Sequence, residues 1–120
     1  MIKGLGVDIV ENSRFTSMEN KEQFIHRYYR PEEIKLIEEK GLSIAIDNFA
    51  VKEAVSKVLG TGFRGFGLTD IEVLRDPLGK PYVNLYGAAK EISDALEINS
   101  FFISISNTKE LSVAVVVAEG

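Results

Sequence analysis

The longest helical pattern in the chain covers residues 44–59, which read Ile-Ala-Ile-Asp-Asn-Phe-Ala-Val-Lys-Glu-Ala-Val-Ser-Lys-Val-Leu and precede Gly60. Apolar residues in its second half recur at spacings of three and four, as on one face of a helix: Val51, Ala54, Val55 and Val58. Either Ser43 or Asp47 can cap the helix N-terminus, and Gly60 suits its C-terminal end. We therefore expect one long helix against which the rest of the chain packs.

Alternating and β-branched runs on both sides of this helix predict strands. In residues 2–10, Leu5, Val7 and Ile9 alternate with Gly4, Gly6 and Asp8, so Asp8 should face away from the apolar side. Runs 69–75 and 81–85 flank the turn 76–80, and runs 100–106 and 111–118 flank a second turn, so we expect two hairpins. In the last run, small side chains share one face, which suits packing on a helix. We expect both faces of that run to be buried.

Shorter helical patterns fill the rest of the chain. Residues 12–40 carry helical spacing that is broken at Pro31, which predicts two short helices, and residues 85–96 return to helical spacing. Helices are thus mostly early and strands mostly late. This order predicts an α+β fold, with a small antiparallel-rich sheet packed against one long helix and shorter helices, formed by a single domain over residues 1–120.

The composition excludes several classes of protein. The chain has no Cys and a single His, which excludes thiolate zinc sites, Cys nucleophiles and imidazole clusters. Its net charge of −4 opposes bulk nucleic-acid binding, and no apolar run approaches the ~20 residues of a membrane helix. The start of the chain also lacks the pattern of a signal peptide. We expect a cytoplasmic protein with no nucleic-acid or membrane partner.

Two motifs are weak guides to function. Residues 60–65 match the G-x-G-x-x-G pattern of dinucleotide sites, but they follow a helix rather than a strand, which rejects a Rossmann site. A glycine-rich backbone beside Arg64 can still approach a phosphate, or it can serve as a connector. His26 lies among basic and aromatic residues without a nucleophile elbow, so we interpret it as a surface or interface residue.

Acidic and basic side chains form a more informative set. Asp8 is unusual in a strand and needs a cation or hydrogen-bond donors, whether from a functional site or from an ordinary salt bridge. Glu53 lies four residues before Lys57, a spacing that an ordinary helical ion pair also explains. The two acids are hard ligands of the kind that Mg²⁺ prefers, and four cations are available for phosphate: Lys52, Lys57, Arg64 and Lys80. Spacing alone leaves open whether they converge.

Five short segments, in this order, carry a resemblance to a known family. They are Gly-Leu-Gly-Val-Asp-Ile-Val-Glu at 4–11, Phe-Ala-Val-Lys-Glu-Ala-Val-Ser-Lys at 49–57, Gly-Thr-Gly at 60–62, Asp76 with Gly-Lys-Pro-Tyr at 79–82, and Ser-Ile-Ser at 104–106 with Thr-Lys-Glu at 108–110. The chain resembles the holo-acyl-carrier-protein synthases, which are small 4′-phosphopantetheinyl transferases. The likeness extends over nearly all of its length.

The resemblance implies transfer of the phosphopantetheine arm of coenzyme A to a serine of an acyl carrier protein, with release of adenosine 3′,5′-bisphosphate. It implies that Asp8 and Glu53 bind Mg²⁺ and that Lys57 offsets charge on the phosphates, which makes these three the catalytic set. Mg²⁺ and a lysine stabilise the negative charge that develops on a pyrophosphate leaving group. Either Glu53, or Asp8 through water, accepts the serine proton, and the sequence does not choose between them.

The resemblance also implies binding residues and partners. The coenzyme A contacts would be Lys52, Lys57, Gly60, Thr61, Gly62, Arg64, Lys80, Pro81, Asn107 and Thr108. Acidic carrier proteins would dock on the first helix, through Arg14, Met18 and Arg27. These lie in a locally basic segment that also holds Lys21 and Arg30. The alternative interpretation of this segment is an ordinary solvated face. A homotrimer with active sites between subunits is implied as well.

The chain departs from the family at two positions. Asn107 stands where the family usually has His, and Asn48 stands where it usually has Arg. An amide donates hydrogen bonds, but it neither titrates near neutrality nor forms an ion pair with a phosphate. The chain is then an enzyme with a weaker grip on the nucleotide, an enzyme in which another cation such as Arg64 compensates, or a paralogue that binds coenzyme A or carrier without efficient transfer. The intact acid pair and helix lysines favour an active enzyme.

Overall fold

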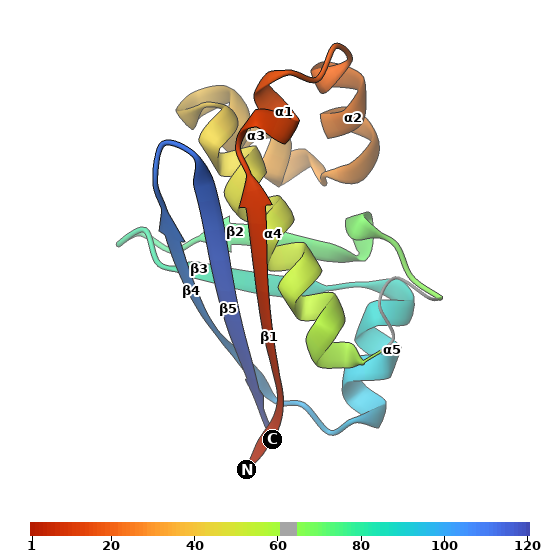
Figure 1. Cartoon of the computed structure of the whole chain (residues 1–120). Coiled ribbons are helices and arrows are strands. Elements are labelled where there is room, and N and C mark those ends of the chain that lie inside the picture. The colour runs from red at the N-terminus through yellow and green to blue at the C-terminus, as the bar shows by residue number, and fades with distance from the viewer. Residues whose placement is uncertain (61–64) are drawn as a thin grey trace.

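The computed structural model describes residues 1–60 and 65–120, and its order of elements matches the expected mixture of helices and strands. The elements are β1 (Ile2–Glu11), α1 (Ser13–Thr16), α2 (Lys21–Tyr28), α3 (Pro31–Lys40), α4 (Leu42–Leu59), a 3-10 turn (Leu68–Asp70), β2 (Ile71–Arg75), β3 (Pro81–Leu85), α5 (Gly87–Ala95), β4 (Ser100–Asn107) and β5 (Leu111–Glu119) (Figure 1). Both expected hairpins are present, as β2–β3 and β4–β5. The expected α+β class is confirmed.

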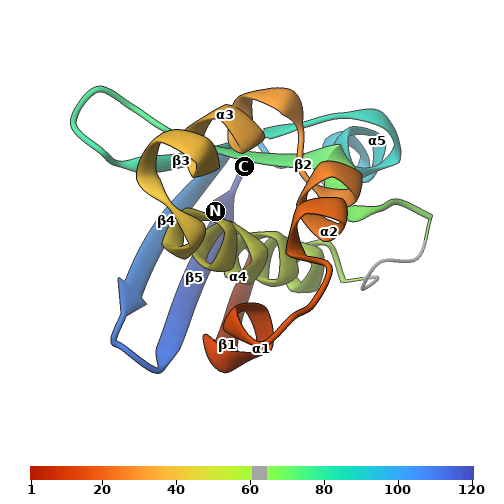
Figure 2. The ribbon, with the colours of Figure 1, turned by 90° about the horizontal axis from the view of Figure 1, so that it is seen from above.

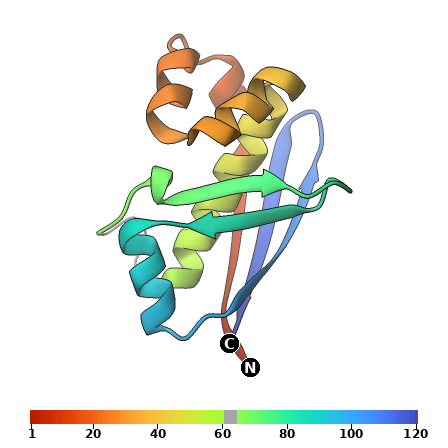
Figure 3. The same cartoon turned by 180° about the vertical axis from the view of Figure 1, so that it is seen from behind.

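Helix α4 lies between two antiparallel sheets. The larger sheet has the strand order β1-β5-β4, and the smaller consists of β2 and β3. Figure 2 shows α4 between the two, and Figure 3 shows the β2–β3 hairpin crossing it from the other side. Because the helix is enclosed by both sheets, most of its residues are buried, polar ones included.

The close approach of β1 to α4 depends on glycine. A Cβ added to Gly6 would lie 2.0 Å from the carbonyl oxygen of Ala54, which no side chain allows. In the neighbouring strand β5, Ala114 and Ala118 are fully buried on the side that faces the helix. Small residues therefore let the helix axis lie close to the sheet, as expected for the last strand.

The N-terminal helices cover one end of α4 with aromatic side chains. The ring centroid of Phe15 lies 5.6 Å from that of Phe24 and 5.4 Å from that of Phe49, in edge-to-face geometry. The chain breaks at Pro31 as predicted, but residues 12–30 form two helices, because a single turn, α1, precedes α2. A four-residue helix has too few positions to give a helical period in the sequence.

The ends of α4 match the predictions only in part. Gly60 ends the helix with a φ of 78°, as predicted. The predicted N-terminal cap at Ser43 or Asp47 is wrong, since α4 begins at Leu42 without a side-chain cap. Gly41 alone joins α3 to α4 with a φ of 102°, a conformation that favours glycine, and this tight turn leaves no room for a separate capping residue.

One face of the larger sheet is covered by none of the other described parts of the chain. Leu5, Val7 and Ile9 are 65%, 50% and 62% exposed. The strand pairings place further exposed apolar residues on the same side, and together they form what we call the outer sheet face: Leu5, Val7, Ile9, Phe102, Leu111 and Val115. The expectation that both faces of 111–118 are buried is therefore wrong for a single chain, because α4 covers only one of them. In residues 1–60 and 65–120, no helix combines the length and apolar character needed to cross a membrane.

Candidate active site

Strand β1 and helix α4 bring the two predicted acids to one place. Asp8 lies two residues after Gly6 and on the same face, while Glu53 precedes Ala54, the residue that Gly6 approaches. Burial raises the pKa of Glu53, and the charge of Asp8 is near enough to raise it further. The side chain of Asp8 is only 17% exposed. The convergence that spacing left open is thus present in the fold.

Lys57 completes this cluster from the next turn of α4. Its ammonium donates to the carbonyl oxygen of Val7 at 2.8 Å and to Oδ1 of Asp8 at 3.2 Å. The alternative of an ordinary ion pair with Glu53 is not what the structure has, because the salt bridge formed is between Lys57 and Asp8. Lys57 is about half exposed, which leaves its remaining donors open to a phosphate.

The electrostatics of the cluster suit a divalent cation. Burial and the charge of Asp8 both raise the pKa of Glu53, while Arg14 and Lys57 oppose the shift. Two neighbouring carboxylates that repel each other gain most from a bound cation. No group of three or more His, Asp or Glu side chains that could hold a metal is found in the described ranges. Two carboxylates fit Mg²⁺, which keeps several waters and often binds substrate phosphates.

Lys52 does not lie at this site. Its side chain is fully buried, and its ammonium donates to Oε1 of Glu33 at 2.9 Å and to carbonyl oxygens of Leu68 and Ile71. Burial lowers its pKa, and the charge of Glu33 opposes that shift. Lys52 therefore joins α4 to α3 and β2, and its ammonium is not placed to contact a ligand at the surface.

The other residues expected to contact coenzyme A fall into three groups. Gly60 follows Leu59 at the end of α4, near Lys57, whereas Thr61, Gly62 and Arg64 lie outside the described residues. Lys80 is exposed in the β2–β3 turn, where its backbone N–H donates to Oδ1 of Asp76 at 2.9 Å, and Pro81 begins β3. Thr108 accepts backbone hydrogen bonds within the β4–β5 turn. The described members of this set therefore lie at three separate places: the end of α4, the β2–β3 turn and the β4–β5 turn.

Asn107 and Asn48 are the two departures from the family. Asn107 contacts Asp47 of α4, and Asn48 is the next residue of the same helix. The Asn107 amide donates to both carboxylate oxygens of Asp47, at 3.1 and 3.0 Å. Asn48 is fully buried, donates to Oε2 of Glu33, and accepts from Nη2 of Arg75 at 2.9 Å. Sequence reasoning assigned no role to Asp47 beyond capping and none to Arg75. The signal that could have revealed this cluster is the pair of polar residues Asp47 and Asn48 inside an apolar helix.

The predicted carrier-binding residues lie on α1, α2 and the link between them. The Arg14 guanidinium carbon lies 4.8 Å from the centroid of the Phe49 ring, one helical turn before Glu53. Met18 is half-buried and Arg27 is exposed. Arg30, expected in the same basic segment, turns away: it donates to the carbonyl oxygen of Thr69 and stacks on Tyr86. The exposed basic surface is therefore smaller than the sequence suggests.

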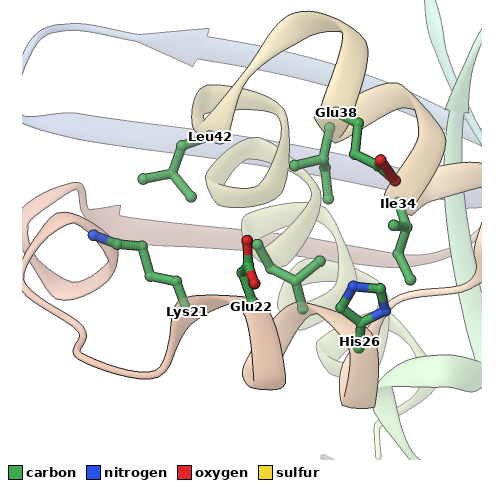
Figure 4. A pocket seen from close by; sticks show the side chains of 8 residues that line it. Lys21, Glu22, His26, Ile34, Glu38 and Leu42 are labelled. Atoms are coloured by element: carbon green, nitrogen blue, oxygen red, sulfur yellow. The ribbon is translucent and has the colours of Figure 1, made fainter.

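A separate hollow lies between α2 and α3. It has a volume of about 350 Å³, and its apolar lining includes Ile25, Ile34 and Leu42. Ile34 and Leu42 are labelled in Figure 4. His26 lies at its edge and is exposed, in line with its interpretation as a surface residue. Neither Asp8 nor Glu53 lines this hollow, so it is distinct from the acidic cluster.

Comparisons with known proteins agree over nearly the whole chain. Residues 4–116 match the model of the 4′-phosphopantetheinyl transferase superfamily. Holo-[acyl-carrier-protein] synthases of Lachnoclostridium phytofermentans and Clostridium botulinum (strain Alaska E43) are 45% and 47% identical, covering 99% and 97% of this chain and 97% and 98% of theirs. The crystal structure of the Neisseria meningitidis synthase has a TM-score of 0.89 at 33% identity, with both chains fully covered. The Helicobacter pylori synthase in complex with coenzyme A has a TM-score of 0.82 at 36% identity, covering 96% of this chain and 99% of that one.

Proposed function

Because this chain belongs to the 4′-phosphopantetheinyl transferase superfamily, we propose that it moves the phosphopantetheine arm of coenzyme A to a serine of an acyl carrier protein. Adenosine 3′,5′-bisphosphate is the second product. The proposal treats residues 1–120 as one catalytic domain. The observation that carries it is the convergence of Asp8, Glu53 and Lys57 from two elements that are distant in sequence.

Asp8 and Glu53 would hold Mg²⁺ in this proposal, and Lys57 would contact the pyrophosphate of coenzyme A. The ion, when bound, neutralises charge on the pyrophosphate oxygens and aligns them. Lys57 is already anchored at Asp8, so it adds a positive charge at the same place without reorganisation. Binding residues outside this cluster would be Gly60, Lys80, Pro81, Asn107 and Thr108.

The reaction needs one proton acceptor. The serine oxygen attacks the phosphorus next to the pantetheine arm, the bond between that phosphorus and the bridging oxygen breaks, and adenosine 3′,5′-bisphosphate leaves. The serine proton moves to a carboxylate. Two acceptors are within the proposed site: Glu53 directly, or Asp8 through a water molecule.

We propose that the carrier docks through Arg14, Met18 and Arg27. Because carrier proteins of this kind are acidic, exposed arginines would attract them through charges that salt screens. We expect the KM for carrier to rise several-fold between low and high ionic strength, while the KM for coenzyme A changes less. A KM for carrier that is independent of ionic strength would contradict this docking surface.

We propose that the outer sheet face is buried in a homotrimer whose active sites lie between subunits. Exposed contiguous apolar patches in soluble proteins commonly mark contact surfaces. In support, this face is made by paired strands, so it is broad and preformed, and Val7 lies opposite Val115 at its centre.

The decisive experiment is transfer itself. The chain is incubated with apo carrier protein, coenzyme A and Mg²⁺, and mass spectrometry measures the phosphopantetheine increment on the carrier. Glu53→Gln should abolish the increment and keep the fold, because it removes a ligand charge at nearly constant volume. Glu91→Gln, an exposed change on α5, is the matched control and should transfer normally.

A second candidate is a binding protein of the same fold. It is favoured by one observation, the commitment of the Asn107 amide to Asp47 in place of a titratable group. Measurable coenzyme A binding without any increment on the carriers tested would establish that candidate and reject transfer.

A further inference from the structure

Arg75, at the end of β2, is held in place, but none of the described residues gives it a carboxylate partner. Its Nη2 donates to Oδ1 of Asn48 at 2.9 Å, and its Nη1 donates to the carbonyl oxygen of Leu74 at 3.3 Å. Within residues 1–60 and 65–120, no ion pair shorter than 4.0 Å involves Arg75. Since a guanidinium has five N–H donors, several remain for another acceptor.

The two carboxylates whose charges act on Arg75, Asp47 and Glu33, are engaged with other partners. Asp47 and Glu33 act on Arg75 through longer-range attraction, although burial has the larger effect and lowers its pKa. Glu33 binds the ammonium of Lys52 and the amide of Asn48, while Asp47 accepts from Asn107 and from the hydroxyl of Ser112. A half-buried guanidinium with free donors and a fixed orientation is a favourable site for a phosphate.

The position of Arg75 connects two groups of proposed coenzyme A contacts. In the β2–β3 ladder it pairs with Pro81, which follows Lys80. Through Asn48 and its neighbour Asp47 it is also joined to Asn107. A cavity of about 300 Å³ opens beside Arg75, lined by Lys35 and Tyr82 and also by the carboxylates Glu32 and Glu39. The basic side chains of the lining, Lys35 and Arg75, balance the acidic ones in charge. The guanidinium would therefore select a ligand through the direction of its hydrogen bonds rather than through net charge.

We propose that Arg75, oriented by Asn48, binds the 3′-phosphate of coenzyme A. The inference rests on the proposed function and names a residue that none of the sequence motifs includes. Glu53 and Asn48 are five residues apart on α4, or about 140° around the helix, so Arg75 and the acidic cluster lie on different sides. The pyrophosphate belongs to the acidic cluster, which leaves the 3′-phosphate for Arg75. The family usually has arginine at the position of Asn48. In this chain Asn48 would instead orient the guanidinium of Arg75, which comes from β2.

The test compares coenzyme A with 3′-dephospho-coenzyme A as ligands of Arg75→Gln, Arg75→Lys and the unchanged protein. Isothermal titration calorimetry gives the Kd of each ligand, and the transfer assay gives the KM. We expect Arg75→Gln to raise the Kd for coenzyme A by about 10-fold or more and to change the Kd for 3′-dephospho-coenzyme A by less than about twofold. The effect of Arg75→Lys should lie in between. Asn48→Ala should reduce the same discrimination by a smaller factor. Lys90→Gln, which affects only an exposed pair with Asp94, is the control and should change neither.

Two results would overturn the inference. One is equal weakening of both ligands by Arg75→Gln, and the other is discrimination as strong as in the unchanged protein. Because discrimination is a ratio within one variant, partial loss of folded protein does not change it. If the unchanged protein neither binds coenzyme A nor transfers, the proposed function fails instead, so the two failures are distinguishable.

Discussion

The Lys52 ammonium and the Glu33 carboxylate lie 2.9 Å apart, and both side chains are fully buried. Asn48 donates to the second oxygen of the same carboxylate. Such a group is stable only when complete, because removing one partner leaves a buried charge without compensation. At the scale of single residues, then, the interior of this protein depends on a few polar contacts that span three elements.

Lys52→Met should therefore lower the free energy of unfolding by about 3–5 kcal/mol, because Glu33 loses its charged partner. Urea denaturation measures this. The control is Lys90→Met, which breaks the exposed pair with Asp94 and should cost no more than about 0.5 kcal/mol. If Lys52 instead contacts coenzyme A, as the sequence suggested, Lys52→Met would raise the KM for coenzyme A with little loss of stability.

Tyr29 gives the molecule a predictable alkaline response. Its hydroxyl donates to the carbonyl oxygen of Ala45 at 2.6 Å, and burial raises its pKa far above the ordinary value of 10.0. The unfolded chain therefore loses this proton first as the pH rises. The contribution of the hydroxyl is fully present below pH 10 and is lost above it.

Tyr29→Phe should accordingly be less stable than the unchanged protein by about 1 kcal/mol at neutral pH, with a difference that shrinks as the pH rises above 10. Urea titrations at several pH values measure it. The same change at the exposed Tyr82 on β3 provides the comparison. A difference that grows with pH at Tyr29 would contradict the assigned cause.

At the scale of elements, the distance between β1 and α4 decides whether the acids meet. Gly6→Ala places a methyl group against the Ala54 carbonyl, which is backbone and has little freedom to move. We expect a loss of about 2–3 kcal/mol in the free energy of unfolding, together with weaker Mg²⁺ binding, because Asp8 moves relative to Glu53. Gly67→Ala is the control, since open space surrounds Gly67 and its φ of −118° suits any residue. Equal stability of the two variants would reject the role given to Gly6.

Much of the element pattern was predictable because it follows local periodicity. Pro31, Gly60 and the two hairpin turns ended elements where expected, since their backbone preferences act within a few residues. The cap of α4, the position of Lys52 and the contact of Arg75 with Asn48 were not predictable, because each depends on which distant element packs beside it. Asp8 and Glu53 were proposed from the resemblance, and only the fold brings them near enough for the charge of Asp8 to act on Glu53.

At the scale of the whole molecule, the outer sheet face should control assembly. Ile9→Lys places a charge on that face, and we expect it to convert a trimer into monomers, because a buried unpaired charge is costly. Analytical ultracentrifugation gives the mass in solution. Leu96→Lys makes the same kind of change at a partly exposed residue that follows α5 and should leave the mass unchanged. A monomeric unchanged protein would reject the trimer itself.

The two faces of strand β1 have different surroundings. Its even-numbered residues 4 to 10 face α4, and among them is the carboxylate of Asp8, while its odd-numbered residues form part of the bare apolar surface. If a neighbouring subunit covers that surface, no position between 4 and 10 is free to vary on its own. A substitution in this segment would then be tolerated only together with a compensating change in the helix or in the neighbouring subunit.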